Sequence, residues 1–223
     1  MSQINFYTKS GRRVHRAIIA GIIVLSVFAA TPLFAAGMSP AAGSPSAVEL
    51  KTVLRALWED HVAFTREYII SALAGLPDTA AVADRLLANQ DQLGNAIKPY
   101  YGDQAGAKLT ALLRAHIMIA TQIVSAAKAG DSAAVDAGEK TWHQNGDEIA
   151  AFLAGANPNW SKAALSDMLS KHLDYTTTEV VSRLKSDWKA DIAAYDVGAQ
   201  HMLAFSDMLA GGIVAQFPAK FTK

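Results

Sequence analysis

Apolar residues recur at helical spacing along the chain from about residue 46 onward. The first stretch shows this pattern clearly, in a stripe formed by Leu50, Leu54, Trp58, Val62 and Ile69. Apolar residues three, four or seven positions apart are typical of the buried face of an α-helix. No bounded, β-branched segment alternates with a period of two, as a strand would. The pattern therefore predicts an all-α fold.

Turn and cap residues divide this region into six predicted helices. Ser46 and Glu49 form a capping box at the first start, and each later helix begins near a Ser or Asp that can cap it. The helices run from Ser46 to Gly75, Asp78 to Pro99, Asp103 to Gly130, Asp131 to Gly155, Ser161 to Leu184, and Ser186 or Asp187 to about Gly212. Short connections should make neighbours antiparallel.

An internal repeat groups these helices in pairs. A shift of about 55 residues aligns His61 with His116, and a second shift of about 56 reaches His172. A large apolar residue stands three positions before each histidine. Three helical hairpins follow, none of which can bury its apolar face alone. The fold class is therefore a six-helix bundle of three antiparallel hairpins, preceded by a signal helix.

The partner helices of the hairpins repeat a second polar pattern. Asn89 and Asp91 align with Asn145 and Asp147, whereas the third copy has Phe205 at the Asn position and keeps the aspartate as Asp207. Asn89 and Asn145 fall on apolar stripes. The three histidines do so too, and they stand at similar distances from their helix starts. The sequence therefore predicts a polar layer at mid-height of the bundle.

Two interpretations of this polar layer remain open. In one, each histidine bonds Asn, Asp or Thr across its hairpin, and the layer sets helix register, as buried polar residues can. In the other, neutral imidazoles converge on a divalent transition metal with carboxylate support. The metal candidates are His61, His116, His172, Asp91 and Asp147. Neither His-Glu-x-x-His nor Glu-x-x-His occurs, which favours the structural interpretation.

A further polar face lies on the predicted fourth helix. Glu139, His143 and Asp147 are spaced four residues apart and would stack along one side. Such a ladder is typical of a solvated surface with local pairs. It is a weaker candidate site than the histidine layer.

The N-terminal part of the chain predicts export. Residues 1–37 place Lys9, Arg12, Arg13 and Arg16 before an apolar run and a small-residue cluster, the order of a secretory signal peptide. The alternative is an uncleaved anchor at residues 17–36, which would tether the protein to the inner membrane. Residues 38–45 read as a flexible linker, 46–219 as the helical domain and 220–223 as a tail. We expect a periplasmic or extracellular protein that meets a membrane only through its N-terminal segment.

Composition changes this picture in two ways. The chain of 223 residues has 20 basic and 20 acidic residues, but residues 1–37 hold four basic residues and no acid, so the remainder carries a net charge of −4. That balance argues against a nucleic-acid partner. The absence of cysteine excludes thiol nucleophiles and iron–sulfur ligation. No Walker, dinucleotide-binding or nucleophile-elbow motif occurs.

Three segments carry a resemblance to known proteins: Leu57–His61, Asn95–Tyr100 and Ala156–Trp160. With most of residues 50–219, they resemble a family of exported bacterial all-helical proteins of unknown activity. Some members carry a glycosyltransferase label, which this chain does not support because it lacks alternating strands and helices and a nucleotide-sugar motif. The resemblance implies a bacterial source and brings no catalytic residues.

The sequence thus favours a binding or structural module over an enzyme. The leading hypothesis is an exported helical bundle that holds a metal ion or small ligand at the His/Asn/Asp layer. The alternative is a structural or protein-interaction module in which that layer only sets helix register.

Overall fold

A computed structural model describes residues 46–221 of the chain. They form α1 (Ala47–Ala74), α2 (Thr79–Ala129), α3 (Ser132–Ala156), α4 (Lys162–Leu184), α5 (Trp188–Gln216) and the short 3-10 helix η1 (Pro218–Lys220). No strand occurs among the described residues, and the predicted all-α fold is confirmed. The predicted signal peptide (1–37), alternative anchor (17–36), linker (38–45) and last two residues of the tail lie outside the described part.

Residues 46–221 form five α-helices where the sequence predicted six, because two predicted helices join within α2. Only Gly102 interrupts them, with φ 82° and ψ 170°, a backbone conformation that glycine adopts without steric cost. The chain turns back there, so that a Cβ atom on Gly94 would lie 2.7 Å from the carbonyl oxygen of Gly106. The residues around Pro99 are helical where a connection was expected.

Most helix starts follow their predicted caps. Ser46 and Glu49 form the capping box of α1. One side-chain oxygen accepts a hydrogen bond from the backbone amide three residues further on at each of Asp131, Ser161 and Asp187. Asp78 is the exception, because its own backbone is helical (φ −85°, ψ −5°) and its side chain makes no capping bond. Gly75 and Gly130 end α1 and α2 in the left-handed conformation.

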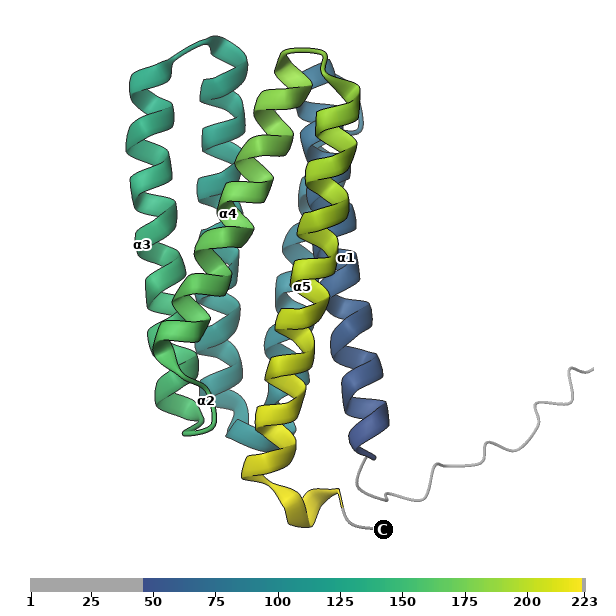
Figure 1. Cartoon of the computed structure of the whole chain (residues 1–223), viewed down its shortest axis with the longest axis vertical. Coiled ribbons are helices and arrows are strands. Elements are labelled where there is room, and N and C mark those ends of the chain that lie inside the picture. Colours follow the sequence, from purple (N-terminus) through teal and green to yellow (C-terminus); the bar gives the residue numbers. More distant parts are fainter. Residues whose placement is uncertain (1–45, 222–223) are drawn as a thin grey trace, which may run out of the picture. The chain divides into compact units, whose positions relative to one another are not determined.

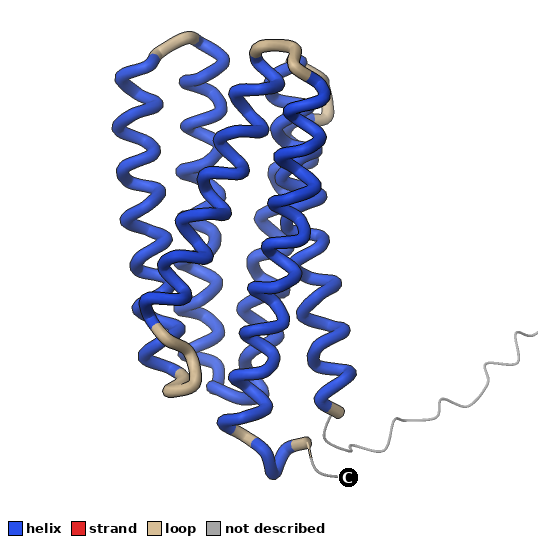
Figure 2. The backbone as a smooth tube through the Cα atoms, viewed as in Figure 1, coloured by secondary structure: helices blue, strands red, loops and turns tan. Residues whose placement is uncertain are grey.

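The helices form a closed ring around one core. α1 packs against α2 and α5, α3 lies between α2 and α4, and α4 packs against α5 (Figure 1). α4 crosses the bundle obliquely, from beside α3 at its start to beside α5 at its end (Figure 1). The loops lie only at the two ends of the helices (Figure 2). Side chains from every helix enter the core, among them Leu54, Leu93, Ile149, Leu165 and Phe205.

α2 is long and apolar enough, by length and composition, to cross a membrane, a property that sequence analysis assigned only to residues 17–36. In the structure 39% of its apolar stretch is buried in the bundle, including Leu109, Leu113, Ile117 and Val124, whereas Met118 is 48% exposed. Core helices of globular bundles meet the same criterion, since burial in protein and burial in lipid select the same residues.

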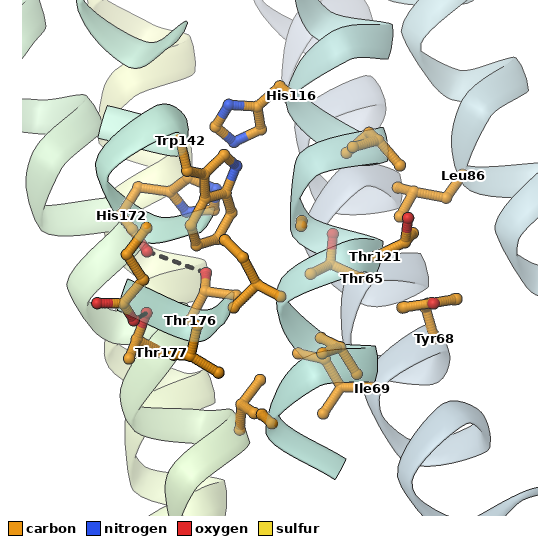
Figure 3. Close-up of a pocket in the computed structure, with 18 of the residues that line it drawn as sticks. Thr65, Tyr68, Ile69, Leu86, His116, Thr121, Trp142, His172, Thr176 and Thr177 are labelled. Carbon is orange, nitrogen blue, oxygen red and sulfur yellow. Dashed lines mark hydrogen bonds between the residues drawn. The ribbon is translucent and has the colours of Figure 1, made fainter. Parts of the chain in front are cut away.

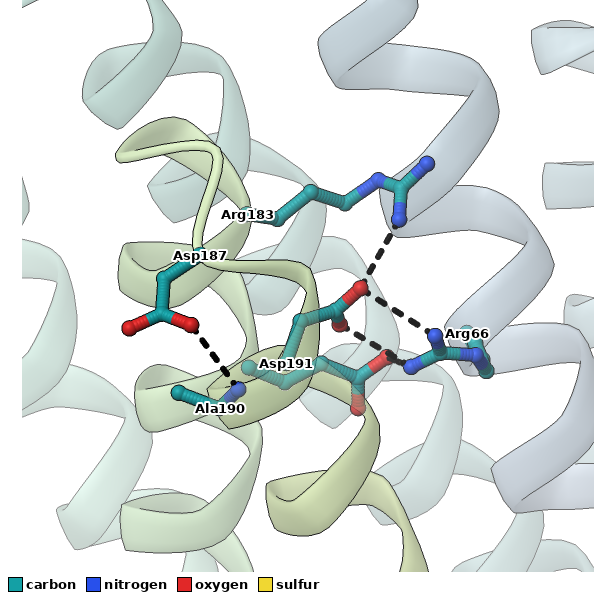
Figure 4. A network of polar contacts seen from close by, with 6 residues as sticks. Arg66, Arg183, Asp187, Ala190 and Asp191 are labelled. Carbon is teal, nitrogen blue, oxygen red and sulfur yellow. Dashed lines mark hydrogen bonds and ion pairs between the residues drawn. The ribbon is translucent and has the colours of Figure 1, made fainter.

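A buried ion-pair network ties α1, α4 and α5 together (Figure 4). The Arg66 guanidinium lies 2.7 Å from Glu179 and 3.0 Å from Asp191, and Arg183 lies 2.9 Å from the other oxygen of Asp191. Asp191 is 1% exposed. Burial raises the pKa of Glu179 to about 7, although Arg66 opposes the shift. Each charge here depends on its partners, because an unpaired buried charge is costly.

We predict that Asp191→Asn lowers the free energy of unfolding by about 3–5 kcal/mol, because two arginines lose their shared carboxylate in a buried site. Asp207→Asn is the matched control. Asp207 pairs with the half-exposed Arg55, and such pairs contribute only about 0–1 kcal/mol. Urea denaturation of both variants measures the difference. Equal losses would contradict the role given to the buried network.

Candidate functional site

The three predicted histidines meet inside the bundle. His61 on α1, His116 on α2 and His172 on α4 are each less than 5% exposed. The ring centroid of His172 lies 5.5 Å from that of His61 and 6.1 Å from that of His116, so His172 connects the other two. Helices of like direction and similar length before the histidine bring these side chains to one height. We call these three residues the histidine cluster.

A repeated side-chain to backbone bond holds the helices next to each histidine. Asn89 Nδ2 donates to Leu57 O at 2.9 Å, and Asn145 Nδ2 donates to Leu112 O at 3.2 Å. In both cases the accepting residue stands four positions before a cluster histidine. These bonds fix the register of α2 against α1 and of α3 against α2.

The third position of this pattern is held by His201. Its Nε2 donates to Met168 O at 2.8 Å, and Met168 stands four positions before His172. The alignment of the internal repeat placed Phe205 at the position of the two asparagines. The residue that makes the bond, His201, lies one helical turn earlier. Phe205 is instead fully buried and packs edge-on against Trp58, 5.1 Å between ring centroids.

A hydrogen bond defines the tautomer of one cluster histidine, His116. Asn145 uses its amide nitrogen for Leu112, so its Oδ1 faces His116 and accepts from Nδ1–H at 2.8 Å. His116 Nε2 therefore keeps its lone pair. Gln90 Nε2 lies 3.3 Å from His61 Nδ1, but its two hydrogens have nearer acceptors in Leu86 O at 2.9 Å and Asn89 Oδ1 at 3.1 Å, so this contact does not fix the tautomer of His61. Within residues 46–221, no group hydrogen-bonds the ring of His172.

Burial keeps the histidine cluster uncharged. Loss of solvation lowers the pKa of His61 to about 3, with a further contribution from His116. It lowers the pKa of His116 to about 4, although Asn145 opposes this. The pKa of His172 falls well below its usual value through burial and through its histidine neighbours. All three are neutral imidazoles at neutral pH, able to donate and accept hydrogen bonds.

The histidine cluster lines one side of a cavity of about 60 Å³ between α1, α2, α3 and α4 (Figure 3). Roughly 10–15 Å³ suffices for one water, so this space is larger than a single-water site. Most of the wall is apolar or aromatic, including Ile69, Leu86, Val124 and Trp142. Thr65 and Thr176 add hydroxyls. Apolar walls with a few convergent polar groups are typical of small-molecule sites.

Three polar atoms beside the histidine cluster lack partners within the described chain: Trp58 Nε1, Trp142 Nε1 and Gln90 Oε1. Trp142 lines the cavity, and its ring centroid lies 5.1 Å from that of His116. Gln90 contacts His61. A buried polar group without a partner costs roughly 1–3 kcal/mol. A hydrogen-bonding molecule in the cavity would be favoured by the Trp142 donor.

The predicted carboxylate ligands lie elsewhere. Asp91 accepts from Arg114 at 3.0 Å and is about half exposed, and Asp147 accepts from Ser166 at 2.9 Å on the surface. No group of three or more His, Asp or Glu side chains in residues 46–221 is arranged to hold a metal ion. The aspartates therefore do not join the histidine cluster. Asp91 pairs with Arg114 in the other part of α2, and Asp147 pairs with Ser166 of α4.

The Glu139, His143 and Asp147 face divides between two places. Glu139 reaches the rim of the cavity, where its carboxylate accepts from Thr177 Oγ1 of α4 at 3.2 Å. His143 and Asp147 line a separate groove with Ser166. The sequence spacing of Glu139 could not predict that it lines the cavity, because its contact with α4 depends on how that helix crosses the bundle.

The fold and the site together define an all-helical bundle with a histidine-lined central cavity. No protein-family model, curated protein or solved structure matches the chain. The resemblance to exported bacterial helical proteins therefore stays an expectation from sequence.

Because the buried histidines stay neutral in the folded protein, we predict that the free energy of unfolding falls on mild acidification. The unfolded chain binds protons on His61 and His116 below about pH 6.5, whereas the folded protein resists until pH 3 to 4. Above pH 6.5 these two histidines therefore do not lower the free energy of unfolding. Below pH 6.5 they lower it, by up to about 1.4 kcal/mol per pH unit for each histidine.

Urea denaturation between pH 7 and pH 4.5 of the wild type and His61→Gln checks this. The slope of unfolding free energy against pH should be smaller in the variant by up to about 1.4 kcal/mol per unit. The opposite contribution of Glu179, whose raised pKa favours the folded state at lower pH, is common to both proteins and cancels. Identical slopes would show that His61 is not held neutral.

Proposed function

We propose that this chain is an exported binding protein that holds a small molecule in the central cavity, against the histidine cluster. One observation carries the proposal: three neutral imidazoles and the Trp142 donor border a cavity in an otherwise packed core. Packed interiors have few voids larger than a water molecule, so a polar-edged cavity suggests a ligand. Export rests on the signal sequence predicted for residues 1–37.

The geometry favours a small molecule over the metal ion expected from sequence. Zinc–nitrogen bonds are roughly 2.0–2.1 Å long and ligating histidines need lone pairs directed at one point. Within the histidine cluster, a hydrogen bond assigns a free lone pair only to His116, on Nε2. Asp91 and Asp147 have partners on the surface. The metal interpretation is kept as an outcome of the test below.

A structural role for the polar layer is the second candidate, and the repeated backbone bonds favour it. Asn89, Asn145 and His201 each bond a carbonyl four residues before a cluster histidine. This regularity supports the proposed three-hairpin repeat, with the two parts of α2 belonging to different hairpins. In that case the layer would set register and the cavity would have no ligand role.

A cavity-filling variant separates the two candidates. Ala120 lines the cavity, so Ala120→Leu should occupy it while leaving the histidines in place. Ala115→Leu is the control, on an exposed position five residues earlier in α2. Xenon and 1-butanol should each shift the NMR signals of cavity methyl groups in the wild type and in Ala115→Leu, and at least tenfold less in Ala120→Leu.

The structural candidate predicts no such shifts in any of the three proteins. Elemental analysis of protein exported by its own signal sequence addresses the metal alternative, with stoichiometric zinc, copper or nickel as the result that would favour it. Absence of probe binding in the wild type would overturn the small-molecule proposal.

A further inference from the structure

We propose that the molecule held in the cavity is uncharged and bears a hydroxyl group on a short apolar body. This inference rests on the proposed function and specifies its ligand class. It follows from three features of the cavity: its size, the hydrogen-bonding groups at its edge, and the near absence of charged side chains in its wall.

The size limits the part of the ligand that lies inside. A volume of about 60 Å³ is well below the roughly 150 Å³ of a cavity that accepts benzene. A chain of about three or four carbon atoms suits this space, and Ile117, Ile123 and Val180 offer it an apolar wall. A longer body would have to extend past the rim at Val181, which is 39% exposed.

The hydrogen-bonding groups at the cavity call for a ligand that both donates and accepts. Trp142 Nε1–H is a buried donor without an acceptor in the described chain. His116 Nε2 is an acceptor, because the proton of this ring is on Nδ1 and is donated to Asn145. The two rings are adjacent, 5.1 Å apart. A hydroxyl carries one donor and two lone pairs, so it can accept from Trp142 and donate to His116.

The wall offers no partner for a charged ligand. Among residues 46–221, no lysine or arginine lines the cavity, and Glu139 is the only Asp or Glu that does. The Glu139 carboxylate lies at the rim and accepts from Thr177. An anion in the cavity would therefore have no cationic side chain as a partner. A cation in the cavity would be separated from the Glu139 carboxylate at the rim. Burying a charge without a partner is strongly unfavourable.

A matched series of four-carbon probes tests this inference by NMR titration: 1-butanol, 1-chlorobutane, butyrate and butylammonium at pH 7. We expect 1-butanol to bind about 2–10-fold more tightly than 1-chlorobutane, the range that one neutral hydrogen bond allows. Butyrate and butylammonium should bind at least 100-fold more weakly than 1-butanol.

Trp142→Phe supplies the control for the hydrogen bond. It keeps an aromatic ring and removes the N–H, so the affinity ratio of 1-butanol to 1-chlorobutane should fall toward one. The ratio stays informative if the variant loses stability, because both probes are measured on the same folded protein.

The outcomes separate this inference from the proposed function. Equal binding of 1-butanol and 1-chlorobutane, an unchanged ratio in Trp142→Phe, or binding of either ion as tight as that of the alcohol would overturn the ligand class while leaving a cavity that binds small molecules. Failure of every probe to bind the wild type would overturn both.

Discussion

The burial of three neutral imidazoles is the constraint on which the rest of the structure depends. Three histidines inside an apolar bundle are tolerated only if they give up their charge. His116 stays neutral while it donates to Asn145, whereas the ring of His172 has no hydrogen-bond partner in residues 46–221. The adjoining Asn89, Asn145 and His201 bond backbone carbonyls across the helix interfaces, which fixes the height of each histidine against its neighbours.

The same arrangement leaves room beside the cluster. Bulky aromatic rings flank the histidines, with Trp58 packed against His61 and Trp142 against His116. α4 runs obliquely across the bundle, from beside α3 at its start to beside α5 at its end (Figure 1). Further along α4, the buried pairing of Arg66 with Glu179 and Asp191 anchors that helix to α1 and α5 (Figure 4). The cavity thus lies between a fixed polar layer and a fixed ion network.

Local rules predicted the parts of the fold that depend on local sequence. The capping box at Ser46, the caps at Asp131, Ser161 and Asp187, and the glycine ends of α1 and α2 follow from residues within a few positions. The meeting of His61, His116 and His172 followed from their spacing after helix starts. The sequence could not show that Asp91 and Asp147 turn toward Arg114 and Ser166, or that His201 takes the place of an asparagine, because both depend on the rotation of neighbouring helices. The cavity and the Arg66 network also depend on how the helices cross, which residue spacing does not encode.

The protonation state of the cluster is the most direct test of this account. A nitrogen–proton correlation NMR spectrum of the imidazole rings, recorded from about pH 7 to pH 5 with and without 1-butanol, reads each ring nitrogen separately. We predict that His61 and His116 stay neutral throughout, that His116 carries its proton on Nδ1, and that 1-butanol shifts the His116 Nε2 signal. Double protonation of either ring above about pH 6, or a His116 Nε2 signal that ignores the alcohol, would contradict it.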